Sequence, residues 1–288
     1  MSALAAMKIT TWNVNGIRAR EGQVFDWVRL EQPDVLCLQE IKASLHQVPV
    51  SLSGLEGYWA FWHGNKGYSG VALLVSKALC TVPPRFFHPP FDHENRIVAV
   101  ELADLIVASI YVPNGGKDFP AKLRFLEAFE AFVGTSLRAG RKLILCGDLN
   151  VARTVTDVHP DLVQPEQIGQ TEGERALLEK IIGHGLVDLL RSFAPEDDRL
   201  FTWWAPWRNN RERNIGWRLD YVLASQALEG QARSCTVDRD FGTSDHGPVT
   251  ARFDGPLFDS TAVVASAAAV AAPEPTPIPQ LDLFGPKR

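Results

Sequence analysis

Asp245 and His246 lie side by side in the turn-forming stretch GTSDHGPVT (residues 242–250), where a carboxylate and an imidazole could act together. Neighbouring residues of a strand point to opposite faces, whereas in a turn both side chains can face one cleft. A lone Asp–His pair is more often two solvated loop residues. The pair therefore indicates a site only if other acids, amides and a phenol converge on it.

Polar residues of these types do recur where short apolar runs begin or end. They are Asn13 and Asn15 after MKITTW, Glu40 after VLCLQ, Tyr111 and Asn114 in IYVPN, Asp148 and Asn150 in LILCGDLN, and Asp220 in RLDYVLAS. Carboxylate and amide oxygens suit Mg²⁺ or Mn²⁺, and the absence of Cys from this set, with a single His, argues against zinc. A hard metal ion, a carboxylate base, a His and a Tyr together fit phosphodiester hydrolysis.

The elements that must position these residues are strands and helices in alternation. The near-continuous apolar runs are typical of strands in sheets covered on both faces. Residues 120–138 carry apolar side chains at helical spacing, and Thr171 with Glu174 fits a capping box for a helix that ends near Gly183 or Gly185. Such interleaving predicts a layered α/β fold.

Composition places the 288-residue chain among ordinary globular proteins, with 45% hydrophobic and 22% charged residues. No apolar run approaches the roughly 18 residues of a membrane span, and no basic segment precedes an apolar one at the N-terminus, so we expect a cytoplasmic protein. The four cysteines are far apart and are expected to be reduced and buried: Cys37, Cys80, Cys146 and Cys235. The net charge of −5 argues weakly against a nucleic-acid partner, but PWRNNRERNIGWR (206–218) carries four arginines against one glutamate.

Seven segments occur in the order found in one nuclease family: WNVNGIRAR, LQEIK, GYSGVALL, IYVPNG, GDLNVA, NIGWRLDYVLAS and TSDHGPV. Over residues 7–254 the sequence thereby resembles the exonuclease III-type apurinic/apyrimidinic (AP) endonucleases of the endonuclease/exonuclease/phosphatase superfamily. The resemblance implies a four-layered α/β sandwich of two packed mixed β-sheets flanked by helices. It also implies a monomeric Mg²⁺- or Mn²⁺-dependent DNA repair nuclease of the bacterial cytoplasm. Its substrate would be double-stranded DNA, cleaved 5′ to abasic sites to leave a 3′-hydroxyl, with 3′–5′ exonuclease and 3′-end-cleaning activities beside this one.

Two alternatives stay open beside this interpretation. One is another phosphodiesterase or phosphatase of the superfamily, against which WNVNGIRAR and NIGWRLDY argue. The other is a non-catalytic adaptor that binds DNA or a sliding clamp. The intact set of Glu40, Asp148, Asn150, Asp220 and His246 argues against an adaptor.

The resemblance assigns roles to individual residues. Glu40 would be the principal metal ligand, helped by Asn13, Asp148, Asn150, Asp245 and His246. Asp148 would act as general base and be steadied by Asn150. Tyr111 would contact the scissile phosphate, and His246, oriented by Asp220, would donate to a phosphate oxygen while Asp245 faces the metal.

DNA contacts follow from the same resemblance. Phosphates would be held by Arg18, Lys42, Tyr68, Arg96 and Asn114, and Arg213 would probe the duplex. An apolar pocket for a flipped abasic sugar would be made by Trp203, Trp217 and Leu219. The sequence departs from the family between Asn150 and Thr171, where it carries no Lys and has Gln170 at a position that is commonly Phe.

The ends of the chain differ in character from the domain between them. We expect an N-terminal extension at 1–6, the nuclease domain at 7–254, an Ala/Pro-rich flexible tether at 255–279 and a short linear motif at 280–288. QLDLF resembles the motif by which bacterial proteins bind the sliding clamp, with Gln280, Leu281, Leu283 and Phe284 as the contacting residues.

Overall fold

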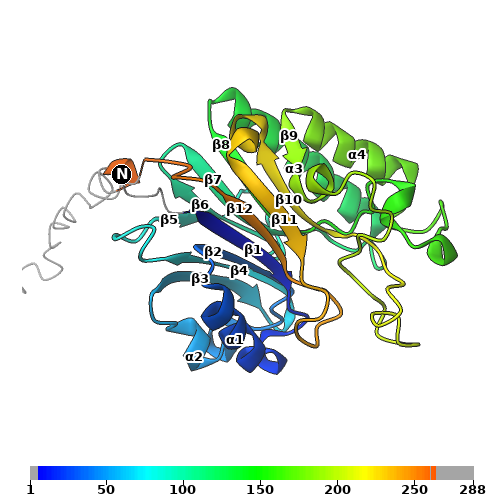
Figure 1. The fold of residues 1–288 in the computed structure, drawn as a ribbon, viewed down its shortest axis with the longest axis horizontal. Coiled ribbons are helices and arrows are strands. Elements are labelled where there is room, and N and C mark those ends of the chain that lie inside the picture. Colours follow the sequence, from blue (N-terminus) through cyan, green and yellow to red (C-terminus); the bar gives the residue numbers. More distant parts are fainter. Residues whose placement is uncertain (1–5, 260, 264–288) are drawn as a thin grey trace, which may run out of the picture.

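Two six-stranded β-sheets pack face to face in residues 6–259 and 261–263, which are the residues that the computed structural model describes (Figure 1). The first sheet has the order β11-β12-β1-β2-β4-β3, with β1 (Met7–Asn13), β2 (Val35–Gln39), β3 (Tyr58–Asn65), β4 (Tyr68–Ser76), β11 (Ala232–Val237) and β12 (Val249–Phe253). The second has the order β5-β6-β7-β8-β10-β9, with β5 (Arg85–Phe87), β6 (Ile97–Leu102), β7 (Leu105–Tyr111), β8 (Lys142–Asp148), β9 (Leu186–Asp188) and β10 (Asp220–Ser225).

Helices cover the outer face of each sheet, as Figure 1 shows. The first sheet carries α1 (Glu21–Glu31) and α2 (Val50–Ser53), and the second carries α3 (Phe119–Arg138) and α4 (Glu172–Gly183). The short α5 (Leu189–Phe193) follows β9, and 3₁₀ turns lie at η1 (Ile17–Ala19), η2 (Leu45–Gln47), η3 (Val155–Asp157), η4 (Pro160–Leu162) and η5 (Gln226–Gln231). The result is the four-layered α/β sandwich of two mixed sheets that the sequence resemblance implied.

The apolar strands are explained by the two covered faces of each sheet. On β4, Val71, Leu73 and Val75 pack into the core between the sheets. Ala72 and Leu74 of the same strand point the other way, into the core beneath α1 and α2. Strands that bury both faces have no solvent side to display polar residues, so their sequences do not alternate.

Capping interactions fix where the two long helices begin. Asp118 accepts a hydrogen bond from the backbone N–H of Ala121 at 2.8 Å, at the start of α3. Thr171 and Glu174 form the predicted capping box of α4, and this helix ends at Gly183 as expected.

Strand direction brings the candidate catalytic residues to one end of the sandwich. The parallel pair β1 and β2 ends with Asn13 opposite Gln39, and Glu40 follows at once. The parallel pair β7 and β8 ends with Tyr111 opposite Asp148. The antiparallel strand β10 starts there too, because Asp220 pairs with Asp148.

The packed body continues past residue 254, since Leu257, Phe258 and Val263 are buried against the core between the sheets. All four cysteines are free and buried, as expected. Among the described helices none has the length and apolarity needed to cross a membrane. The predicted clamp-binding residues 280–284 and residues 1–5 of the predicted extension lie outside the described residues.

Candidate active site

A cavity of about 550 Å³ opens at the end of the sandwich where these strands end. Its walls join polar residues from both sheets to an apolar patch. The lining residues are Asn15, Glu40, Lys42, Tyr111, Asn114, Gly116, Asp148, Asn150, Gln167, Ile168, Trp203, Trp217, Leu219, Asp245 and His246. Residues up to 231 positions apart in the sequence thus share one cavity, which is the convergence that the Asp245–His246 pair required.

Both carboxylate oxygens of Asp148 accept hydrogen bonds from neighbouring groups. Asn13 donates from Nδ2 to Oδ2 of Asp148 at 2.9 Å, and the backbone N–H of Asn150 donates to Oδ1 at 2.9 Å. Burial, opposed by His246 and reinforced by Asp220, raises the pKa of Asp148 to about 7. A fixed carboxylate with such a pKa can take a proton from water near neutral pH.

His246 takes its carboxylate partner from β10 and not from its neighbour in the sequence. Its Nδ1 lies 2.8 Å from Oδ2 of Asp220, which also accepts a hydrogen bond from Thr202 Oγ1 at 2.6 Å. Its Nε2 lies 3.8 Å from Oδ2 of Asp148. Burial alone would lower the pKa of His246, but Asp220, Asp148 and Asp245 raise it to about 10, so the imidazole is cationic at neutral pH.

The ammonium group of Lys42 lies between oxygen atoms of two other side chains of the cavity. Lys42 Nζ lies 2.7 Å from Oε1 of Glu40 and 2.6 Å from Oδ1 of Asn15. Asn15 in turn donates from Nδ2 to Oδ1 of Asp245 at 2.7 Å, and Trp203 Nε1 donates to the other oxygen at 3.0 Å. Burial opposes ionisation of Asp245, but His246, Asn15 and Trp203 lower its pKa. The Lys42 ammonium thus contacts one carboxylate and one amide oxygen, and Asp245 is linked to this position through Asn15. Oxygen groups of these types suit a hard divalent metal ion.

Strained backbone at the strand ends aims these groups into the cavity. Asn15, Glu40 and Asn150 have φ angles of 45°, 55° and 51°, in the left-handed region. Asn adopts this region more readily than most residues, whereas it is uncommon for Glu. Gly147, with φ 147°, has no room for a side chain, since a Cβ there would lie 1.9 Å from the carbonyl oxygen of Ile110. These conformations are held by the surrounding contacts and are typical of functional sites.

Tyr111 lies between the acids and a cationic side chain. The guanidinium of Arg96 lies 5.0 Å from the centre of the Tyr111 ring. Burial, together with the nearby Glu40 and Asp148, raises the pKa of Tyr111 well above its ordinary value. The phenol therefore keeps its proton and can act as a hydrogen-bond donor within the cavity.

An apolar wall stands beside the charged groups. Trp203 and Trp217 meet edge to face with ring centres 5.8 Å apart, and Leu219 lies with them. Ala152 and Val158 pack behind them in the same cluster. Trp203, Trp217 and Leu219 thus present an apolar surface to the cavity, next to its charged groups.

The predicted DNA contacts divide into two groups. Lys42, Asn114, Trp203, Trp217 and Leu219 line the cavity. Arg18, Tyr68, Arg96 and Arg213 do not line it, and the exposed Arg18 and Arg213 lie on η1 and in the loop before β10. Arg96 is buried and donates from Nη2 to the hydroxyl of Tyr68 at 3.0 Å.

Three lining residues were not predicted from the sequence: Gly116, Gln167 and Ile168. The last two lie in the segment where the sequence departs from the family, and nothing in their residue types points to a cavity. Gln170 in this segment is buried, and it bonds to the backbone of Gln164 and Leu162 at 2.9 and 3.1 Å. It therefore shapes the loop from within and does not face the cavity.

Known proteins are similar to this chain in both sequence and fold. Residues 10–246 match the Endonuclease/Exonuclease/phosphatase family. "DNA repair nuclease APEX1" of Danio rerio is 36% identical over 258 residues, which cover 85% of this chain and 82% of the zebrafish protein.

Two solved structures are similar to this chain in fold. A 3′ phosphatase from Neisseria, solved with a product DNA hairpin, has a TM-score of 0.78 and 31% identity, covering 86% of this chain and 99% of that chain. An AP endonuclease from Archaeoglobus fulgidus has a TM-score of 0.75 and 30% identity, covering 86% of this chain and 99% of that chain.

Proposed function

Because the chain belongs to the Endonuclease/Exonuclease/phosphatase family, as a DNA repair nuclease of the AP endonuclease type, we propose that it hydrolyses the phosphodiester 5′ to abasic sites in double-stranded DNA. The products are a 3′-hydroxyl on the upstream strand and a 5′-phosphate on the abasic sugar. The same site would remove 3′ blocking groups and nucleotides from DNA ends, a proposal that the similarity to the Neisseria 3′ phosphatase supports.

The acid–base residues divide the reaction between them. Asp148 accepts a proton from a water molecule, whose oxygen attacks phosphorus as the bond to the 3′ oxygen breaks. His246 donates from Nε2 to a non-bridging phosphate oxygen, because its Nδ1 is bound to Asp220 at 2.8 Å and its positive charge is retained. Tyr111, kept protonated, donates a second hydrogen bond to the phosphate group.

Glu40, Asp245 and Asn15 would hold the divalent cation, with Asp148 and Asn150 beside it. When bound, Mg²⁺ or Mn²⁺ would neutralise charge on the phosphate and the leaving oxygen. Asn13 orients Asp148 in this arrangement: its Nδ2 donates to Asp148, and its Oδ1 accepts from the backbone N–H of Asn15.

The apolar wall beside the acids is the observation that supports an abasic substrate most strongly. A flipped sugar without a base presents mostly apolar surface, and it fits against Trp203, Trp217 and Leu219. A normal nucleotide is larger and loses stacking on extrusion, so it is rejected. Outside the cavity, Arg18 and Tyr68, with Arg96 bound to the Tyr68 hydroxyl, would hold the duplex through its phosphates, which fixes register without reading sequence. Arg213 would probe the duplex.

A pair of reactions on matched duplexes tests this proposal. One duplex carries a single tetrahydrofuran abasic analogue, and the other carries a nick with a 3′-phosphate. Trp217→Ala should slow incision at the analogue by about tenfold or more, because loss of an apolar contact in a substrate pocket costs about 1–3 kcal/mol. Release of the 3′-phosphate should change less. Leu30→Ala, at an exposed apolar side chain on α1, serves as the control. Equal losses in the two reactions would refute the role of the apolar wall.

The clamp partner, the monomeric state and the bacterial cytoplasm remain predictions from the sequence. A tether that ends in a clamp-binding peptide would raise the enzyme's local concentration on clamp-loaded DNA. A pull-down of the sliding clamp with the full chain should lose its signal in the Leu283→Ala, Phe284→Ala double variant. Undiminished capture would reject the motif.

A further inference from the structure

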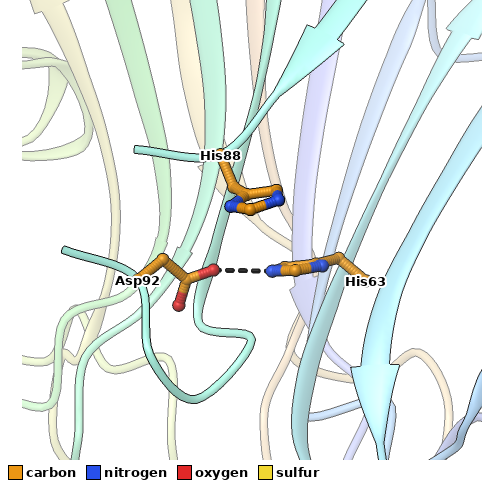
Figure 2. Close-up of side chains that lie close together, drawn as sticks. All are labelled: His63, His88 and Asp92. Carbon is orange, nitrogen blue, oxygen red and sulfur yellow. Dashed lines mark hydrogen bonds and ion pairs between the residues drawn. The ribbon is translucent and has the colours of Figure 1, made fainter. Parts of the chain in front are cut away.

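Two imidazoles and a carboxylate meet at a second place in the molecule, outside the cavity of the candidate active site (Figure 2). His63 lies on β3, and His88 and Asp92 lie between β5 and β6. Each residue offers one ligand atom, and these atoms lie within 4.8 Å of one another. The residues come from the edge strands of the two different sheets or from the segment next to them.

The contacts within this group are short and specific. Oδ2 of Asp92 lies 2.6 Å from Nε2 of His63. The ring of His88 stacks on the ring of His63, with centres 4.5 Å apart and planes inclined by 15°. Figure 2 shows the His88 ring lying over the Asp92–His63 pair, with a ring nitrogen of His63 directed at Asp92.

In the part of the chain that the structure describes, no Lys or Arg side chain forms an ion pair with the carboxylate of this group. The Asp92 side chain is fully buried, and among the described residues its one ion-pair partner is His63. A buried carboxylate needs a compensating positive charge, which either a proton on His63 or a metal ion can supply. Two imidazole nitrogens and one carboxylate oxygen form a ligand set typical of zinc and its neighbours, and they do not suit Mg²⁺.

We propose that His63, His88 and Asp92 bind one divalent transition-metal ion of the zinc class, with water at the fourth position. Tetrahedral zinc with ligands at about 2.0–2.1 Å sets neighbouring ligand atoms about 3.3 Å apart, so the Asp92–His63 contact of 2.6 Å opens slightly when the ion binds. His88 is exposed and can turn its ring to direct a nitrogen at the ion. The ligands differ in kind from the all-oxygen cation position beside Glu40.

The ion would stabilise the edges of the two sheets against each other. The other oxygen of Asp92 accepts a hydrogen bond from the backbone N–H of Arg96 at 2.8 Å. Arg96 contacts the hydroxyl of Tyr68, which begins β4. If the proposed function is right, the ion thereby holds two residues that grip the DNA backbone, without taking part in the chemistry.

Direct metal binding tests this site. The full chain without an affinity tag is titrated with Zn²⁺ by calorimetry, with Mg²⁺ in excess to fill the oxygen-rich position. We expect one Zn²⁺ per chain. Since loss even of a residue that supports a ligand costs about 10–100-fold in affinity, His63→Ala and His88→Ala should each weaken binding at least that much. His93→Ala, at an exposed histidine of the same segment, is the matched control and should bind like the wild type.

A second measurement guards against variants that fail to fold. Co²⁺ in place of Zn²⁺ gives a visible spectrum that reports its ligands, and this spectrum should change in His88→Ala while circular dichroism does not. Wild-type protein that binds no Zn²⁺, or His63→Ala and His88→Ala variants that bind it as tightly as His93→Ala, would overturn the proposal. Nuclease activity is not used as a readout, so failure of the proposed function would leave the zinc result standing.

Discussion

Replacing Asp220 with Asn should convert His246 from a permanently charged donor into one that titrates near neutral pH. Asp220 is the strongest of the groups that raise the pKa of His246 to about 10, while burial acts in the opposite direction. If burial and the remaining carboxylates Asp148 and Asp245 then offset each other, the pKa of His246 falls to about its ordinary value of 6.5. At pH 8 the protonated fraction of His246 would then drop from about 99% to about 3%.

The predicted loss of rate follows from this change in protonation and depends on pH. If only the imidazolium supports the reaction, Asp220→Asn is about 30-fold slower than the wild type at pH 8 and about twofold slower at pH 6.5. Removal of the charged donor altogether sets a ceiling of about 10²–10³-fold. Asp148 responds to both changes: loss of the Asp220 charge lowers the pKa of Asp148 and loss of the His246 charge raises it, so the two effects oppose each other.

Single-turnover cleavage of the tetrahydrofuran duplex between pH 6 and pH 9 measures this ratio. Asp240→Asn, at an exposed carboxylate of the neighbouring loop, is the matched control and should follow the wild type throughout. Circular dichroism and DNA binding of Asp220→Asn should be unchanged, because the amide keeps the size of the side chain. A deficit that is the same at pH 6.5 and pH 8 would refute the assignment of His246 as a cation held by Asp220.

Two stability predictions follow from the same coordinates. Gly147→Ala should lower the free energy of unfolding by on the order of 5 kcal/mol, because the new Cβ would collide with the carbonyl oxygen of Ile110. Gly173→Ala is the control: its Cβ meets open space, so the thermal midpoint should stay nearly unchanged. Lys122→Met should lower the free energy of unfolding in urea by about 3–5 kcal/mol, because it leaves the fully buried Glu174 without its ion-pair partner. Arg85→Ala breaks the largely exposed pair with Glu101 and should lower it by less than about 1 kcal/mol.

The layered fold was predictable because hydrophobic burial acts locally along the chain. The apolar runs named above became β1, β2, β7, β8 and β10, all with buried faces. The strand β3, with the sequence YWAFWHGN, was not anticipated, because it lies at a sheet edge and its side chains are mostly half-buried. Its aromatic and polar residues show neither a continuous apolar run nor regular alternation.

The site was predictable as a set of residues but not as a set of contacts. Strand-end polarity indicated Asn13, Glu40 and Asp148 one by one, and the resemblance paired His246 with Asp220. Neither strand-end polarity nor the resemblance predicted the ion pair between Lys42 and Glu40, because that contact depends on left-handed backbone at both residues. Side chains such as His63 and Asp92 meet only when the two sheets pack together, so no local sequence pattern predicts their contact.

Incision of a duplex with one tetrahydrofuran residue, analysed for the chemistry of both new ends, tests the central assignment most directly. With Mg²⁺, the account predicts a single break 5′ to the analogue that carries a 3′-hydroxyl and a 5′-phosphate. EDTA should abolish the break, and Asp148→Asn should bind the duplex without cutting it. A break 3′ to the analogue, a 3′-phosphate at the break, or full activity of the EDTA-treated enzyme would contradict the assignment of this cavity as a metal-dependent abasic-site nuclease.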